Sequence, residues 1–448
     1  MDKKPRTSRI MRSNEPGFEA ACMDTLFNKR TPINFPEILF QVHRVEDILE
    51  AIQLAKAEGL KVSVVSGGHS WSANHMRKNS LVIDMSFMNA YAVDKPRMQA
   101  TAEPGCYGHT LMSALVKQGL FFPTGHCKGV CLGGYLLKGG FGWHSVELGL
   151  ACENVVGLDI VTADGRIVHA SDNENPDLFW AARGAGSGFF GVVFRYHLKL
   201  YRRPGFIGLN THIYKFEHMD EVVHWMMGLR GQLSDKVELK ISITRKSSVI
   251  HQPSIDVGAF VFADSWAEAR AVTKFMHDCP IKKKASLRIP LIPVTMGIHY
   301  YLTSLYYPDE QRWAVDNIWT HAQPEDLLPS FHQLMKDMPP EPSFLHFEYW
   351  AGAARKRLDM AFSMEDDFFL TAMAAWKNPA DDERHTKFIT EEMQKLEPFA
   401  TGTQLADENL NHRTSKFMST ENLLKLDKIR AKWDTDRLFH EWHSRPTS

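Results

Sequence analysis

Three glycine-rich segments carry the residue types best suited to holding a large, phosphate-containing ligand. The first is Ser66-Gly67-Gly68-His69-Ser70, which directly follows an apolar stretch. Consecutive glycines accept positive φ and let a ligand approach the backbone closely. Successive N–H groups in such a turn form a nest that binds anions such as pyrophosphate. The segment therefore predicts an anion-binding turn that presents an imidazole, although a plain tight turn with a partly buried histidine would fit the same residues.

The second segment is the densest in glycine. It runs from Gly125 to Gly142, and seven of its eighteen residues are glycines. Glycine destabilises a packed core, so this density favours a backbone that wraps a large flat ligand. The segment also holds two thiols, Cys127 and Cys131.

The third segment contains a formal G-x-G-x-x-G at Gly186, Gly188 and Gly191. A nicotinamide-dinucleotide site needs a strand before this motif and a helix after it. Here a helix is expected before it (DLFWAAR) and a strand after it (VVFRYHL), so the Rossmann interpretation is rejected. The chain also lacks G-x-x-x-x-G-K-[ST], which excludes a P-loop.

The elements around these segments follow from hydrophobic spacing and turn residues. A helix is expected where apolar residues recur at helical spacing before Gly59, and a hairpin around Asp164-Gly165. Asn175 is expected to cap a helix that has Pro176 at its first position. The expected elements of this half are helices at 45–59, 107–120 and from 176, and strands at 61–65, 81–85, 98–103, 155–170 (the hairpin) and 190–201.

A linker signal at 202–205 (Arg-Arg-Pro-Gly) separates a second, α+β region. Its expected strands are 238–244 and 258–263, and its expected helices are 267–278 and 309–321. A further helix is expected at 420–433.

Composition excludes several classes of protein. The chain has 448 residues, a net charge of −1 and 44% hydrophobic residues, unlike a disordered or collagen-like chain. A near-neutral net charge means that the chain has no excess of basic residues of the kind that binds nucleic acid or anionic membranes. No apolar run reaches the ~18 residues that span a bilayer, and no signal-peptide pattern is present. The six cysteines are too few for a disulfide scaffold, so we expect a reducing, cytoplasmic location.

Taken together, the segments resemble the flavin-linked oxidases of the vanillyl-alcohol oxidase and p-cresol methylhydroxylase (PCMH) type, and among them the berberine-bridge-enzyme-like branch. The resemblance covers about 37–203 and 415–440. The matching pieces are VSVVSGGHSW, LVIDMS, EPGCYGHTL, FFPTGHCKGVCLGGYLLKGGFGW, ENVVGLDIVTADGRIVHAS, NPDLFWAARGAGSGFFGVVFRYHLKLY and FMSTENLLKLDKIRAKWDTDRLFH.

The resemblance implies an α+β, two-domain FAD-binding fold of the PCMH type. The FAD-binding domain would span 1–203, with its core at about 35–203. A substrate domain built on a large antiparallel sheet would span 204–400. The segment 401–448 would return to the FAD domain.

The resemblance also implies covalent FAD. His69 occupies the position of the histidine bonded to the flavin 8α-methyl, and Cys127 that of the cysteine bonded to flavin C6 in the bicovalent branch. Some family members have only the histidine link, and Cys131 stands where the family often has glycine. Attachment needs a neutral imidazole and a thiolate. The other expected cofactor contacts are Ser66, Gly67, Gly68, Ser70, Gly125, His126, Val130, Cys131, Leu132, Gly133, Gly134, Gly139, Gly140, Gly142, Asn154 and Val156.

A zinc site is the competing interpretation of the thiols and imidazoles in this half. Cys127 and Cys131 have roughly zinc-like spacing, but no second pair follows at a typical distance, so no metal is expected. The residues weighed for zinc were His109, His126, Cys127, Cys131, His144 and Cys152.

The base that deprotonates the substrate is harder to find. The family often has a Y-x-N-Y-type segment before the C-terminal helix, and the equivalent stretch 400–418 lacks that tyrosine. The strand 344–350 resembles the family strand that faces the flavin. By alternation His346 and Glu348 share one face and Tyr349 lies on the other. Glu348 and Tyr349 are both candidate bases, because the sequence does not tell which face meets the cavity.

The expected function is an FAD-dependent oxidase that removes a hydride from an alcohol, amine or activated C–H carbon of a small molecule. O₂ would then reoxidise the flavin and give H₂O₂. The alternatives are a dehydrogenase with another electron acceptor and a flavin-free relative that only binds ligand.

Overall fold

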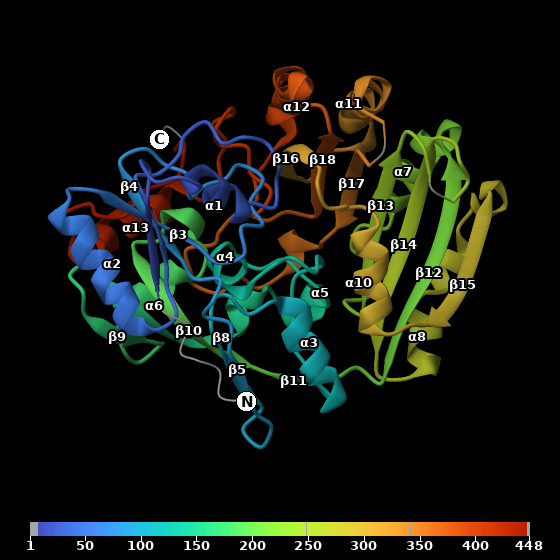
Figure 1. Cartoon of the computed structure of the whole chain (residues 1–448). Coiled ribbons are helices and arrows are strands. Elements are labelled where there is room, and N and C mark those ends of the chain that lie inside the picture. The colour runs from blue at the N-terminus through green and yellow to red at the C-terminus, as the bar shows by residue number, and fades with distance from the viewer. Residues whose placement is uncertain (1–7, 248, 341, 446–448) are drawn as a thin grey trace.

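The computed structural model describes residues 8–247, 249–340 and 342–445. Its strands form a four-stranded, a five-stranded, a two-stranded and a seven-stranded sheet (Figure 1). The three smaller sheets use strands up to residue 202, and the seven-stranded sheet uses strands from 206 to 376. The structure is therefore an α+β fold with a large antiparallel sheet, as the sequence predicted.

The four-stranded sheet carries the first glycine-rich segment at its edge. β2 (Ile38–Gln41), β4 (Ser80–Asp84) and β3 (Lys61–Val65) run parallel, and β1 (Arg9–Arg12) pairs antiparallel with β2. Helix α2 (Val45–Ala57) connects β2 to β3 and ends before Gly59, whose φ is +66°. The predicted helix and strand are confirmed, and β3 leads directly into Ser66.

The five-stranded sheet is antiparallel, in the order β5 (Tyr91–Asp94), β6 (Gln99–Ala102), β10 (Gly191–Lys199), β8 (Val155–Thr162) and β9 (Ile167–Ala170). The hairpin predicted at Asp164-Gly165 is confirmed by the pairing of β8 with β9. A short pair joins β7 (Leu120–Phe121) to β11 (Tyr201–Arg202). Besides α2, the described α-helices of this half are α1 (Phe18–Asp24), α3 (Gly108–Lys117), α4 (Leu132–Leu137), α5 (Ser145–Leu148) and α6 (Pro176–Ala182).

The large sheet is antiparallel throughout. Its order is β15 (Leu287–Pro293), β12 (Phe206–Lys215), β14 (Ser254–Ala263), β13 (Val237–Thr244), β17 (Phe344–Tyr349), β18 (Phe368–Trp376) and β16 (Arg312–Thr320). One face shares an apolar core with α7 (Met219–Gly228), α11 (Pro324–Asp337) and α12 (Asp382–Lys395). The other face meets the first half of the chain through aromatic clusters. The remaining helices are α8 (Trp266–Val272), α9 (Lys274–Asp278) and α10 (Met296–Ser304).

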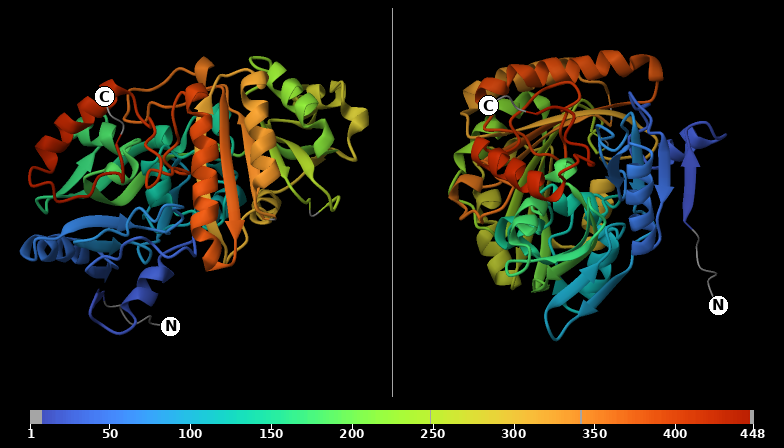
Figure 2. Two further views of the ribbon diagram at one scale, coloured as in Figure 1. Left: turned by 90° about the horizontal axis from the view of Figure 1, so that it is seen from above. Right: turned by 90° about the vertical axis from the view of Figure 1, so that its left-hand side faces the viewer.

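The C-terminal segment packs against the first half of the chain. Helix α13 (Thr420–Trp433) lies against α6, and the red segment runs beside the green and blue elements in Figure 2. The strand β3 gains a partner there, because the Val62 N–H donates to the Leu438 carbonyl at 2.8 Å and the His440 N–H donates to the Val62 carbonyl at 3.0 Å. The domain limits drawn from the sequence remain a prediction.

One sequence-based element prediction was wrong, and two others need correction in detail. The stretch 309–321 was expected to be a helix, but it holds the strand β16. Every residue of β16 is buried, so its pattern has no alternation to separate it from a buried helix. Asn175 is the N-cap residue of α6, as predicted, but its side chain makes no capping hydrogen bond: it has φ +45°, and its side-chain amide donates to the His169 carbonyl at 2.6 Å. The expected helix 267–278 is split at Thr273 into α8 and α9.

Candidate functional site

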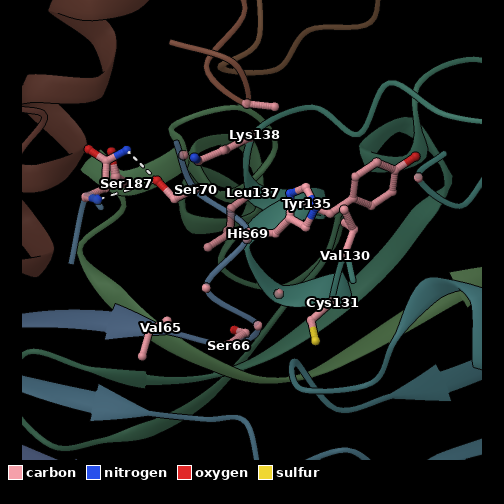
Figure 3. Close-up of a pocket in the computed structure, with 18 of the residues that line it drawn as sticks. Val65, Ser66, His69, Ser70, Val130, Cys131, Tyr135, Leu137, Lys138 and Ser187 are labelled. Carbon is pink, nitrogen blue, oxygen red and sulfur yellow. Dashed lines mark hydrogen bonds between the residues drawn. The ribbon is translucent and has the colours of Figure 1, made fainter. Parts of the chain in front are cut away.

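One cavity brings the three glycine-rich segments together. It encloses about 1720 Å³ of empty space, part of which is open to solvent. Its walls include the turn after β3, the 125–134 segment and the start of β10 (Figure 3). The strands β17 and β18 and the stretch 404–407 complete the walls from the other half of the chain.

Glycine is required where the first two segments touch. A β-carbon on Gly67 would lie 2.5 Å from Cys131 Sγ, and one on Gly133 would lie 2.3 Å from Ser66 Oγ. The third segment leads into β10, and β10 contacts the second segment, because the Tyr196 hydroxyl donates to the Gly133 carbonyl at 3.0 Å. The absence of these side chains therefore sets the shape of the cavity wall.

His69 presents a neutral imidazole to the cavity. Its ring stacks on Phe27, with centroids 4.2 Å apart and 18° between the planes, and Trp71 contacts it edge-on. Burial lowers the pKa of His69 to about 4. A β-carbon on Gly129 would lie 3.1 Å from His69 Cδ2, so the turn after Cys127 packs directly on this ring. The segment that holds Cys127 and the imidazole thus lie together, as the covalent-flavin hypothesis requires.

The two thiols differ in their surroundings. Cys127 lines the cavity, where burial and the nearby Asp407 raise its pKa and Lys240 opposes the shift. These surroundings keep the thiol protonated and do not by themselves supply the thiolate that attachment needs. Cys131 donates from Sγ to the Gly105 carbonyl at 3.3 Å and, in Figure 3, points away from His69. Burial also raises the pKa of Cys131, to about 12.

Six of the residues predicted to contact the cofactor lie outside the cavity lining. The three later glycines allow close packing within the protein: a β-carbon on Gly142 would lie 2.2 Å from the Tyr135 hydroxyl and 2.3 Å from the Thr124 carbonyl oxygen. Asn154 donates to the carbonyls of Leu148 and Leu150 at 2.9 and 3.0 Å, which is a structural role. The six are Leu132, Gly139, Gly140, Gly142, Asn154 and Val156.

The two candidate bases lie on opposite faces of β17. Tyr349 packs in the helix-covered core, and its hydroxyl oxygen accepts a hydrogen bond from the Gly231 N–H at 2.8 Å. Glu348 is buried and lines the cavity together with His346. His346 Nε2 lies 3.3 Å from Glu348 Oε2. The geometry therefore places Glu348, and not Tyr349, within reach of a bound ligand.

Glu348 belongs to a buried charge network that reaches the second glycine-rich segment. Lys240 Nζ lies 3.4 Å from Glu348 Oε1, 3.2 Å from Glu238 Oε2 and 2.7 Å from His126 Nε2. Burial alone would raise the pKa of Glu238, but Lys240 and His126 bring it down to about 2. Burial lowers the pKa of His126, and the Lys240 charge adds to the effect. The network therefore keeps charged groups in a buried part of the cavity wall, where each charged group has a neighbouring partner.

Sequence reasoning missed two partly buried charged residues of the lining. Asp407 accepts a hydrogen bond from Trp71 Nε1 at 2.7 Å, and burial raises its pKa. Lys138 is deeply enclosed, which lowers its pKa, while Glu408 and Asp407 oppose the shift. Both stand in stretches already singled out: Lys138 in the glycine-dense segment and Asp407 in the stretch that lacks the family tyrosine.

The residues present fit a dinucleotide. Gly68, with φ +63°, shapes the turn after β3, and Lys138 and Ser187 lie in the same wall (Figure 3). A lysine ammonium and a glycine turn suit a pyrophosphate. His69 and Cys127 line the same cavity. Of the residues weighed for zinc, the described part of the chain brings no three to within metal-binding reach of one another.

Comparison with known proteins identifies similar sequences and folds. A family model described as "FAD binding domain" matches residues 36–171. The FAD-linked oxidoreductase ptmO of Penicillium ochrochloron is 30% identical over 426 residues, which cover 94% of this chain and 93% of that protein. The solved structure of BBE-like 1 from Physcomitrella patens superposes with a TM-score of 0.84 at 16% identity, covering 97% of this chain and 96% of the other. That of 6-hydroxy-D-nicotine oxidase from Arthrobacter nicotinovorans superposes with a TM-score of 0.82 at 19% identity, covering 98% and 97%.

Fold and site together define an FAD-dependent oxidoreductase. More specifically, the chain belongs to the FAD-linked oxidoreductases and has the fold of the berberine-bridge-enzyme-like proteins. Within the described residues, no helix has both the length and the apolar character needed to cross a bilayer.

Proposed function

We propose that the protein is an FAD-dependent oxidase acting on a small molecule, with H₂O₂ as the product of O₂ reduction. The observation that carries this proposal is the arrangement of one cavity with His69 and Cys127 in one wall and the buried Glu348 in another. Bound FAD would accept a hydride from the substrate and pass the electrons to O₂. A dehydrogenase with another electron acceptor remains the alternative.

The proposal includes covalent attachment of FAD through His69 and also through Cys127. The low pKa of His69 supports the first link, because the neutral ring has a lone pair available for bond formation. For the second link, the thiol proton must pass to a base as the bond forms, since burial raises the pKa of Cys127. Each link would replace a C–H bond of the flavin, so two protons and two electrons would leave, and O₂, the acceptor in this proposal, would take them up to give H₂O₂. Cys131 is the weaker candidate because its thiol is hydrogen-bonded to Gly105.

Glu348 is the proposed proton acceptor for the substrate. Its Oε1 makes no hydrogen bond, although the Lys240 ammonium lies 3.4 Å away. His346 contacts the other oxygen and so orients the carboxylate. A base placed in this way can take a proton from a hydroxyl or amine as the hydride leaves. Asp407, a partly buried carboxylate of the lining, is the competing candidate.

The wall formed by the large sheet favours a substrate with an apolar body and one ionisable or hydroxyl group. Phe369 and Met373 of β18 line this wall together with Glu348, and Tyr307 adds to it from the connection before β16. Apolar walls with a few placed polar groups are typical of small-molecule sites.

The test is a panel of small alcohols and amines mixed with the purified protein without oxygen, read by bleaching of the flavin absorbance. A bleached sample is then exposed to air and its H₂O₂ is measured. One H₂O₂ per substrate oxidised supports an oxidase. Bleaching with slow reoxidation by air favours the dehydrogenase, and a colourless protein after expression with ample flavin favours the flavin-free relative.

A further inference from the structure

Two histidines and an aspartate converge on the five-stranded sheet, away from the cavity. His169 Nδ1 lies 2.8 Å from Asp159 Oδ1, and His197 Nε2 lies 3.2 Å from Asp159 Oδ2. One ligand atom from each of the three lies within 4.8 Å of the others. The three side chains are partly exposed, at 18% for Asp159, 38% for His169 and 31% for His197, so an ion can reach them from solvent.

The strand register puts these side chains on one face. His169 on β9 is opposite Asp159 on β8, and His197 on β10 is opposite Gly157, two residues before Asp159. Directly opposed residues, and residues two apart on one strand, share a face of a sheet. The neighbouring strands β9, β8 and β10 at one side of the sheet (Figure 1) therefore supply one ligand residue each, and β8 also supplies Gly157.

Gly157 leaves the space in which the two rings meet. A β-carbon there would lie 2.9 Å from His169 Cε1 and 3.5 Å from His197 Cδ2. Any other residue at 157 would push the imidazoles apart. The rings approach each other with centroids 5.3 Å apart and planes at 75°, so their nitrogens aim at one carboxylate and do not stack.

We propose that Asp159, His169 and His197 form a binding site for a divalent transition-metal ion, with Zn²⁺ as the best fit. Two imidazoles and a carboxylate are a common protein ligand set for zinc, and a water completes the tetrahedron. Bonds of about 2.1 Å place tetrahedral ligand atoms roughly 3.4 Å apart. A displacement of each ligand atom by about an ångström, through side-chain rotation, brings the three atoms to that spacing. Binding replaces the two His–Asp hydrogen bonds by metal–ligand bonds.

Arg195 is the cation that competes for this carboxylate. Its guanidinium NH1 lies 3.5 Å from Asp159 Oδ2 and the side chain is 48% exposed, so it can turn into solvent when a metal arrives. The proposed ion would join three neighbouring strands of the FAD-binding half. β10 also lines the cavity through Val193 and Tyr196, and the ion would therefore stabilise the sheet behind the cofactor site without taking part in the reaction.

The experiment titrates the chelator-treated flavoprotein with ZnCl₂ by isothermal calorimetry and measures its thermal midpoint with and without Zn²⁺. We expect one Zn²⁺ per chain and a higher midpoint, because the metal binds the folded state. His169→Ala, His197→Ala and Asp159→Asn should each weaken binding by at least about tenfold. His332→Ala is the matched control, since His332 has a carboxylate partner, Asp220, at 2.7 Å but belongs to no such triad.

A wild-type chain that takes up well under one Zn²⁺, or histidine variants that titrate like the wild type, would overturn the proposal. The flavin spectrum and the metal-free midpoint of each variant report whether it has folded. If Asp159→Asn fails that check, the two histidine variants still decide the outcome, because each removes a ligand from a partly exposed position.

Discussion

Lys240 and Glu348 lie directly opposite each other on neighbouring strands of the large sheet, with Nζ 3.4 Å from Oε1. Both are buried, Lys240 at 7% and Glu348 at 1% exposure. The same ammonium contacts Glu238 and His126. A buried charge needs a partner, and here one lysine serves two carboxylates. Glu348 consequently keeps one oxygen without a hydrogen bond at the cavity wall.

The first prediction concerns Glu348. Glu348→Gln keeps the shape of the side chain but removes the proton acceptor, and Lys240 stays paired with Glu238. The rate of flavin reduction by substrate without oxygen should fall by roughly 10²- to 10⁴-fold. Stopped-flow absorbance measures this rate, and the flavin spectrum before mixing shows whether the cofactor is still held.

Tyr349→Phe is the control for this prediction. Tyr349 lies on the same strand but on the helix-covered face, where it meets Gly231. Its loss should leave the reduction rate nearly unchanged and lower only stability. If Glu348→Gln reduces the flavin at the normal rate and Asp407→Asn reduces it slowly, Asp407 and not Glu348 is the base.

The second prediction concerns the covalent links. His69→Ala should leave FAD attached through Cys127, and Cys127→Ala should leave it attached through His69. Only the double variant should release FAD on acid precipitation, because either bond alone retains the cofactor. Yellow colour in the precipitate and the intact protein mass measure attachment.

Cys131→Ser is the matched control for attachment, since Cys131 is the nearest other thiol in the sequence and contacts Gly105. It should keep both links. If Cys127→Ala changes neither the attached mass nor the flavin spectrum, the bicovalent proposal fails while the link through His69 survives.

The sequence predicted the local elements well where residues next to one another in the chain decide the structure. Asp164-Gly165 predicted a hairpin turn, and Gly59 the end of a helix. The strand β16 was mistaken for a helix because burial on both faces removes the polar–apolar alternation by which a strand is predicted. Its burial depends on α12, which lies far along the chain and packs against it.

The site was predictable only in part, for a related reason. Glycine marks close approach, but the sequence does not say to what: Gly67 and Gly133 shape the cavity, whereas Gly142 accommodates Tyr135. Alternation along β17 separates Glu348 from Tyr349, yet the choice of face depends on the helices that cover the other side. Asp407 becomes a site residue only through long-range packing.

The third prediction concerns stability against acid. His299 is completely buried, and neither ring nitrogen has a hydrogen-bond partner. Burial lowers its pKa from 6.5 to about 4. Between these values the unfolded chain binds the proton and the folded chain does not, so stability falls as the pH drops from about 6.5 to about 4. At pH 5 this histidine alone should cost about 2 kcal/mol of unfolding free energy relative to neutral pH.

His299→Phe tests this assignment, because the ring packs on Trp143 with centroids 5.1 Å apart and a phenyl ring fits such surroundings. The loss of stability between pH 7.5 and pH 5, measured by urea unfolding, should be smaller in the variant. His277→Gln, at an exposed position, should leave it unchanged. An equal loss in His299→Phe and wild type would show that other histidines carry the effect. Those with pKa values lowered by burial are His69, His75, His126, His212, His385, His412, His440 and His443.

The fourth prediction separates glycines that pack the protein from glycines that border the cavity. A β-carbon on Gly142 would lie 2.2 Å from the Tyr135 hydroxyl, whereas one on Gly134, at the cavity wall, would meet nothing within 4 Å. Gly142→Ala should therefore lower the unfolding free energy by about 1–3 kcal/mol through overpacking. Gly134→Ala should leave it nearly unchanged. Urea unfolding of both variants measures the difference, and the yield of bound flavin is read in parallel. Equal destabilisation by the two substitutions would mean that Gly134 is also packed against protein. Gly134 would then not line the cavity.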